Sequence, residues 1–119
     1  ILTALVLPCA FQIFFGEPLS QLSGLLQHSQ GRVVLVVAHP DDEAVFFWPT
    51  LLQLRSAGVA LSVLCLSTGN ADGLGERRTL EMQRSCASIG VSGKDLRVVD
   101  HPDLQDGFHF WSVETVSRE

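Results

Sequence analysis

The expected fold depends on one stretch, Arg32-Val33-Val34-Leu35-Val36-Val37-Ala38-His39-Pro40-Asp41-Asp42-Glu43. Residues 33–38 form a continuous apolar run without alternation, which is typical of a strand buried on both faces of a parallel sheet that is covered by helices. Open α/β sheets place their binding sites at the carboxyl ends of the strands. We therefore predict that the polar residues after Ala38 lie at a functional edge of a mainly parallel sheet.

Metal-ligand and acid/base side chains are concentrated directly after this strand, at His39, Asp41, Asp42 and Glu43. Imidazole nitrogen and carboxylate oxygen bind zinc and other divalent ions, and a catalytic site leaves one position for water. His39 and Asp42 can face one ion from a turn that opens into a helix, which leaves Asp41 free as a general base. The alternative is that the acidic residues only stabilise the first turn of a helix. That alternative explains neither His39 nor Pro40.

Composition excludes several other classes of function. The chain has 119 residues, which suits one domain, and a net charge of −5 with a pI near 5.2. A nucleic-acid groove would need clustered Lys and Arg, and here the basic residues are scattered. Cys9, Cys65 and Cys86 show no Cys-x-x-Cys spacing, so we expect buried free thiols rather than a disulfide framework or a cysteine metal site.

The rest of the pattern alternates between helices and strands. We expect a helix with Pro49 in its first turn and Gly58 as its stop, a buried strand over 59–66, a helix over 76–89 and a short strand over 96–99. The glycine-rich loop 67–75 lies at the same sheet edge as His39. Its glycines do not make a dinucleotide fingerprint, so we expect no nucleotide cofactor.

The first residues differ in composition from the rest. Residues 1–15 are almost wholly apolar, although a bilayer crossing needs about 20 apolar residues. We expect 1–16 to be a membrane anchor or signal-type segment, clipped in this sequence, which lacks an initiator Met. A buried core helix is the alternative. The folded domain then occupies 17–119.

The motif Ala38-His39-Pro40-Asp41-Asp42-Glu43, with Phe46, Phe47 and Pro49 behind it, resembles the signature of the PIG-L/LmbE-like zinc de-N-acetylases. The later stretches 64–75, 78–81 and 85–86 resemble the eukaryotic branch, the N-acetylglucosaminyl-phosphatidylinositol de-N-acetylases. The resemblance covers roughly residues 33–107. It implies that 17–119 is the N-terminal part of a de-N-acetylase domain, an α/β Rossmann-like three-layer sandwich that is incomplete at the C-terminus.

The resemblance also implies an activity and a location. The expected reaction is metal-dependent removal of acetate from N-acetylglucosaminyl-phosphatidylinositol, a step of GPI-anchor biosynthesis, with Zn²⁺ or another divalent ion as cofactor. The substrate would be a lipid-linked amino sugar. The protein would lie in the endoplasmic reticulum membrane with its active domain facing the cytoplasm. Neither nucleic acid nor a nucleotide is an expected partner.

Arg77 and Arg78 lie in the first turns of an expected helix, where basic charge opposes the helix macrodipole. Two explanations are open: ion pairs with Glu76 and Glu81, or a role at the site. The resemblance implies the second for Arg78, because the Arg-x-x-Glu arginine of the family lies at the substrate pocket. A guanidinium fork suits a phosphate or sugar hydroxyls.

The resemblance further implies that a third metal ligand, and a histidine that assists catalysis, come from a His-x-x-His stretch later in the family's sequence. No such stretch occurs here. His101 or His109 could substitute only if a loop folded back. The second functional hypothesis is therefore a truncated, catalytically inactive Rossmann-like fragment that lacks the third ligand.

Overall fold

The computed structural model describes residues 32–107 and 110–119. The predicted anchor at 1–16, Cys9 and His109 lie outside these described residues. Within the described ranges, no helix combines the length and the hydropathy that a bilayer crossing would require.

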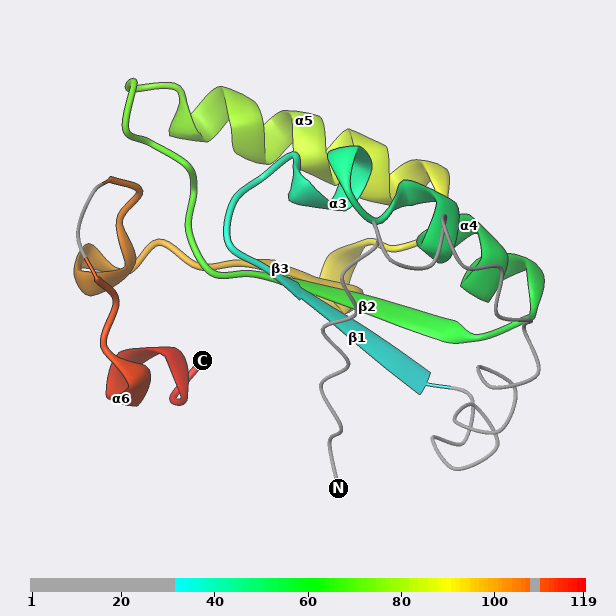
Figure 1. Ribbon diagram of the computed structural model, residues 1–119. Helices are drawn as coiled ribbons and strands as arrows, with labels where there is room; N and C mark the ends of the chain where they lie inside the picture. Colours follow the sequence, from blue (N-terminus) through cyan, green and yellow to red (C-terminus); the bar gives the residue numbers. More distant parts are fainter. Residues whose placement is uncertain (1–31, 108–109) are drawn as a thin grey trace.

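A parallel three-stranded sheet forms the centre of the described fold (Figure 1). Its strands are β1 (Arg32–Val37), β2 (Ala60–Cys65) and β3 (Leu96–Val98), in the order β1-β2-β3. The register pairs Val37 with Cys65 and Cys65 with Val98, so the carboxyl ends of the three strands are level with one another. The predicted α/β class with a parallel sheet is therefore confirmed.

Three helices pack on one face of this sheet (Figure 1). They are α3 (Asp42–Val45), α4 (Trp48–Ser56) and α5 (Gly75–Ser88). Proline stands in the first turn of α4, where its missing N–H costs nothing, and Gly58 follows the helix with a φ of 76°. Three short elements complete the described chain: η1 (Gly93–Asp95), η2 (Pro102–Leu104) and α6 (Val113–Val116). Ser112 caps α6, since its hydroxyl accepts the Thr115 N–H.

The hydrophobic core lies between the sheet and these helices. Its members come from β1 and β2, from the inner faces of α4 and α5, and from residues that flank β2 and α5: Val37, Leu51, Leu54, Val59, Leu61, Val63, Cys65, Met82, Cys86, Ile89 and Val91. The other face of β1 is different, because Val34 and Val36 are 39% and 36% exposed. The prediction that β1 is buried on both faces is therefore wrong for this structure, in which α3, α4 and α5 all cover the same face.

Cys65 and Cys86 are buried and free, as predicted. Burial raises the pKa of the Cys86 thiol from 9.0 to about 11, and the nearby Glu43 carboxylate adds to the rise. Burial also raises the pKa of Cys65, to about 12. The Cys65 thiol donates to the Ser67 carbonyl, 3.1 Å away.

Candidate active site

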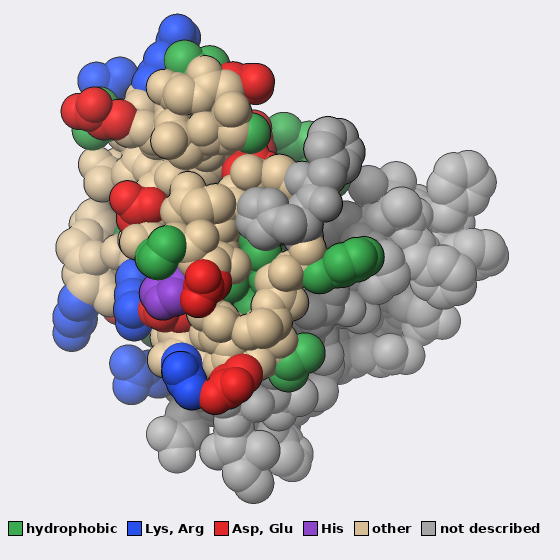
Figure 2. Space-filling model, turned by 90° about the vertical axis from the view of Figure 1, so that its left-hand side faces the viewer, with side chains coloured by type: hydrophobic (Ala, Val, Ile, Leu, Met, Phe, Trp, Pro, Cys, Tyr) green, Lys and Arg blue, Asp and Glu red, His purple; other side chains and the backbone are tan. Residues whose placement is uncertain are grey.

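The polar segments that follow the three strands meet at one edge of the sheet. Residues 38–42 follow β1, residues 66–70 follow β2, and the segment that contains η2 follows β3. Ser67 joins the first two segments, because its hydroxyl donates to the Ala38 carbonyl at 2.9 Å and accepts the Gly69 N–H at 3.2 Å. Figure 2 looks onto this side of the molecule and shows a histidine among acidic and basic side chains.

Asp42 fixes the turn that follows β1. Its Oδ2 atom accepts the backbone N–H groups of Ala38 and His39, at 3.1 and 3.0 Å. These two hydrogen bonds hold the Asp42 carboxylate against the backbone of Ala38 and His39. His39 Nδ1 is 4.0 Å from the same oxygen, so the two predicted metal ligands do lie side by side.

The donor chemistry of His39 and Asp42 fits two positions of a divalent-ion site. Two ligands of one tetrahedral zinc ion, each about 2 Å from the metal, lie roughly 3.3 Å apart. The observed 4.0 Å between His39 Nδ1 and Asp42 Oδ2 is close to that separation. Among residues 32–107 and 110–119, however, no group of three or more His, Cys, Asp or Glu is placed to hold a metal.

Asp41 has the only positive φ of any non-glycine residue in the described ranges, 112°. An L-residue in such a conformation costs on the order of 1–3 kcal/mol, so neighbouring contacts must hold it there. Two contacts do so: Glu43 Oε2 accepts the Asp41 N–H at 3.0 Å, and Arg78 Nη2 pairs with Asp41 Oδ2 at 3.0 Å. Glu43 itself is only 1% exposed.

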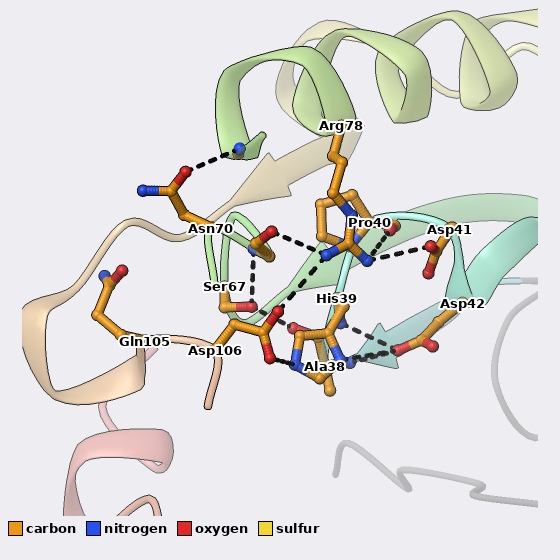
Figure 3. A network of polar contacts seen from close by, with 12 residues as sticks. Ala38, His39, Pro40, Asp41, Asp42, Ser67, Asn70, Arg78, Gln105 and Asp106 are labelled. Atoms are coloured by element: carbon orange, nitrogen blue, oxygen red, sulfur yellow. Dashed lines mark hydrogen bonds and ion pairs between the residues drawn. The ribbon is translucent and has the colours of Figure 1, made fainter. Parts of the chain in front are cut away.

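Arg78 connects the segments of the site (Figure 3). Its Nη1 donates to the Gly69 carbonyl at 2.8 Å, and its Nη2 donates to the Pro40 carbonyl at 3.0 Å and pairs with Asp41. The partner of Glu81 is the neighbouring arginine, Arg77, at 2.9 Å. The ion-pair explanation thus holds for Arg77, and Arg78 lies at the site with Asp41.

Asp106 is a site residue that the sequence interpretation missed. Its Oδ1 lies 3.1 Å from His39 Nε2, and its Oδ2 lies 3.5 Å from Arg78 Nη1 (Figure 3). The Trp111 ring also approaches His39, with ring centroids 5.9 Å apart. The rule that had drawn attention to His39, a polar segment after a strand of the sheet, applies equally to the segment after β3 and could have suggested Asp106.

His101 does not join this cluster. Its Nδ1 accepts the Asp103 N–H at 3.1 Å and caps η2, so this residue has a local structural role.

The carboxylates of the site also affect the buried thiol of Cys65. Burial is the main cause of the rise in the pKa of Cys65 to about 12, and the negative charges of Asp42 and Glu43 raise it further.

A parallel α/β sheet with histidine, carboxylates and arginine at the carboxyl edge defines a class of α/β proteins whose polar site is suited to a divalent ion and to acid/base chemistry. The family described as "PIG-L: GlcNAc-PI de-N-acetylase" matches residues 34–119. The chain belongs to this family. No solved structure shows a significant match.

Three similar proteins carry closely related names. The N-acetylglucosaminyl-phosphatidylinositol de-N-acetylase of Saccharomyces cerevisiae is 35% identical over 96% of this chain and 40% of its own length. The Bos taurus protein of that name is 41% identical over 63% of this chain and 30% of its own length. A "probable" enzyme of this name from Dictyostelium discoideum is 38% identical, over 73% and 34% respectively. The chain thus spans between 30% and 40% of the length of these relatives.

Proposed function

We propose that the protein removes acetate from N-acetylglucosaminyl-phosphatidylinositol, with a divalent ion such as Zn²⁺ as cofactor, in GPI-anchor biosynthesis. One observation supports this most directly: His39, Asp41 and Asp42 lie together with Arg78 at the carboxyl edge of the sheet in a chain that belongs to this family. The relatives' names give the substrate class.

In this proposal His39 and Asp42 hold the ion, which would polarise the acetamide carbonyl and acidify a water molecule. Asp41 accepts a proton from that water as general base. The water oxygen adds to the carbonyl carbon, the C–N bond breaks, and the sugar nitrogen takes up the proton that Asp41 had accepted. The products are the free amine and acetic acid, which ionises to acetate. Asp41 is suited to this task because its side chain is 61% exposed at the site edge, while its backbone is held by Glu43.

Arg78 has two roles in the proposal. Its contacts with two backbone carbonyls and two carboxylates hold Asp41 and Asp106 in place. Its side chain is still 26% exposed. We propose that this exposed part meets the sugar-phosphate end of the substrate, where a guanidinium favours phosphate oxygens.

We further propose a location for the protein and a complete fold. Residues 1–16, by their apolar composition, would anchor it in the endoplasmic reticulum membrane, with the active domain facing the cytoplasm and within reach of a lipid-linked substrate. Further chain on the exposed face of β1, at Val34 and Val36, would complete a Rossmann-like three-layer sandwich.

A catalytically inactive Rossmann-like protein is the second candidate. It is supported by the described residues alone, which contain no group of three metal-type side chains placed to hold an ion. Two protein ligands would give only weak binding of the ion. The two candidates differ in whether the purified protein retains metal and releases acetate.

The test uses the full-length protein that contains this chain, with elemental analysis and acetate release from the lipid-linked substrate. We expect one zinc per protein, loss of the metal in His39→Ala, and retained metal with roughly 100-fold or greater loss of activity in Asp41→Asn. Asp72→Asn, an exposed loop residue, is the matched control and should match wild type. Full metal retention in His39→Ala, or unchanged turnover in Asp41→Asn, would refute the assignment.

A further inference from the structure

The imidazole of His39 lies between two carboxylates that approach different ring nitrogens. Nε2 is 3.1 Å from Asp106 Oδ1, within hydrogen-bond distance, and Nδ1 is 4.0 Å from Asp42 Oδ2. Figure 3 shows Asp106 and Asp42 on opposite sides of the ring. A neutral imidazole carries one N–H and one lone pair, so these two neighbours cannot both accept a proton from it.

Asp106 is the better placed acceptor of the two. Asp42 Oδ2 already accepts two backbone N–H groups, from Ala38 and His39, whereas Asp106 Oδ1 faces the imidazole. An Nε2–H that donates to Asp106 leaves the Nδ1 lone pair directed toward Asp42. That is the side on which His39 and Asp42 could share an ion.

The position of Asp106 is itself fixed by several contacts. Its Oδ2 pairs with Arg78 Nη1 at 3.5 Å. The preceding residue, Gln105, donates from its side-chain Nε2 to the His101 backbone carbonyl at 2.8 Å. The backbone carbonyl of Gln105 accepts the Trp111 indole N–H at 3.0 Å. Trp111 also lies beside the His39 ring, so this side chain bounds the imidazole and holds the backbone next to Asp106.

We propose that Asp106 is a positioning residue: it accepts the Nε2–H of His39, selects that tautomer, and so presents Nδ1 as the metal ligand beside Asp42. This inference rests on the proposed function, because it assigns the ligand nitrogen within the same site. Histidine ligands generally donate their second ring N–H to such an acceptor, and loss of the acceptor typically weakens metal binding 10- to 100-fold. Asp106 acts through His39 and does not itself hold the ion.

The first test needs no variant. Two-bond ¹⁵N–¹H correlation spectra of the histidine-labelled full-length protein, free of metal and at a pH of about 8.5 where an ordinary imidazole is neutral, report the tautomer. We expect a protonated Nε2 and an unprotonated Nδ1 for His39, assigned by the signal that His39→Gln removes. An Nδ1–H tautomer, or a ring protonated on both nitrogens, would overturn the proposal.

The second test compares Asp106→Ala and Asp106→Asn with Asp103→Ala. Asp103 is a matched control, because it is an exposed carboxylate close to the ring of His101, 4.0 Å away, which does not belong to the site. We expect Asp106→Ala to yield mixed tautomers and a 10- to 100-fold weaker Zn²⁺ affinity in competition titrations. Asp106→Asn, which retains an acceptor oxygen, should restore the tautomer, and Asp103→Ala should match wild type.

These readouts separate the two proposals. If wild-type protein binds no Zn²⁺, the proposed function fails, and the spectra still decide whether Asp106 sets the tautomer. If wild type binds Zn²⁺ and Asp106→Ala changes neither the His39 signal nor the affinity, the positioning role is refuted while the proposed function stands.

Discussion

The buried thiols of Cys65 and Cys86 predict how the protein responds to alkaline solution. Burial raises their pKa values from 9.0 to about 12 and about 11. Because the folded-state values are higher, the native state keeps its thiol protons at a pH where the unfolded chain has lost them. The full stability is present below pH 9.0, the pKa of the exposed thiol, and falls as the pH rises toward the folded-state values.

The size of the effect follows from linkage. At pH 10 each unfolded thiol is about one unit above its pKa while the folded thiols remain mostly protonated, so each contributes a loss of about 1.4 kcal/mol. Together the two thiols should lower the free energy of unfolding by about 3 kcal/mol between pH 8 and pH 10. That is a large share of the 5–15 kcal/mol typical of a folded domain.

The assay is urea unfolding at pH 8 and pH 10 under reducing conditions. The matched control is the double variant Cys65→Ala with Cys86→Ala, which lacks both thiols and should lose about 3 kcal/mol less than wild type over this interval. The chain contains one lysine, Lys94, and no tyrosine, so few other groups in it titrate there. Equal losses for wild type and double variant would refute the reasoning, whatever the absolute stability of the variant.

Two further predictions concern the site. Arg78→Lys should lower acetate release at least tenfold, because an ammonium group cannot donate at once to the Gly69 and Pro40 carbonyls as the guanidinium does. Arg77→Lys alters only an exposed ion pair with Glu81. It should leave the rate of acetate release unchanged and shift the free energy of unfolding by no more than about 0.5 kcal/mol. Equal rates for all three proteins on the lipid-linked substrate would contradict this. Asp41→Gly should be about 1 kcal/mol more stable than Asp41→Ala in urea unfolding, because glycine tolerates the φ of 112°. Identical midpoints would show that the Asp41 backbone is not strained.

The local elements of the fold could be predicted because each depends on a short pattern. The apolar runs at 33–38 and 59–66 correspond to β1 and β2, and the helix expected at 76–89 is α5, one residue earlier at each end. Apolar character at consecutive positions does not, however, show how many helical layers cover a sheet. Val34 and Val36 are exposed in the structure. The local pattern could not predict this, because the residues that cover a second face of a sheet lie far away in the sequence.

The candidate site could be predicted only in part, for the same reason. His39, Asp41 and Asp42 lie together in the sequence, so the structure was bound to bring them close. Asp106 contacts His39 in space but lies far from it in the sequence, and it belongs to no local motif. The contacts of Arg78 were equally inaccessible, because two of its acceptors are backbone carbonyls, which have no residue signature.

The charge balance of the site gives a physical reason to expect a cation there. Asp41, Asp42, Glu43 and Asp106 bring four carboxylates to this edge. Among the described residues, Arg78 is the only Lys or Arg that pairs with any of them, through Asp41 and Asp106. Backbone N–H groups stabilise Asp42 and Glu43 but add no net charge. This excess of negative charge acts on a neighbouring group, since Asp42 and Glu43 both help to raise the pKa of Cys65. A divalent ion beside His39 would offset the excess, so metal binding should stabilise this edge of the sheet as well as supply the chemistry.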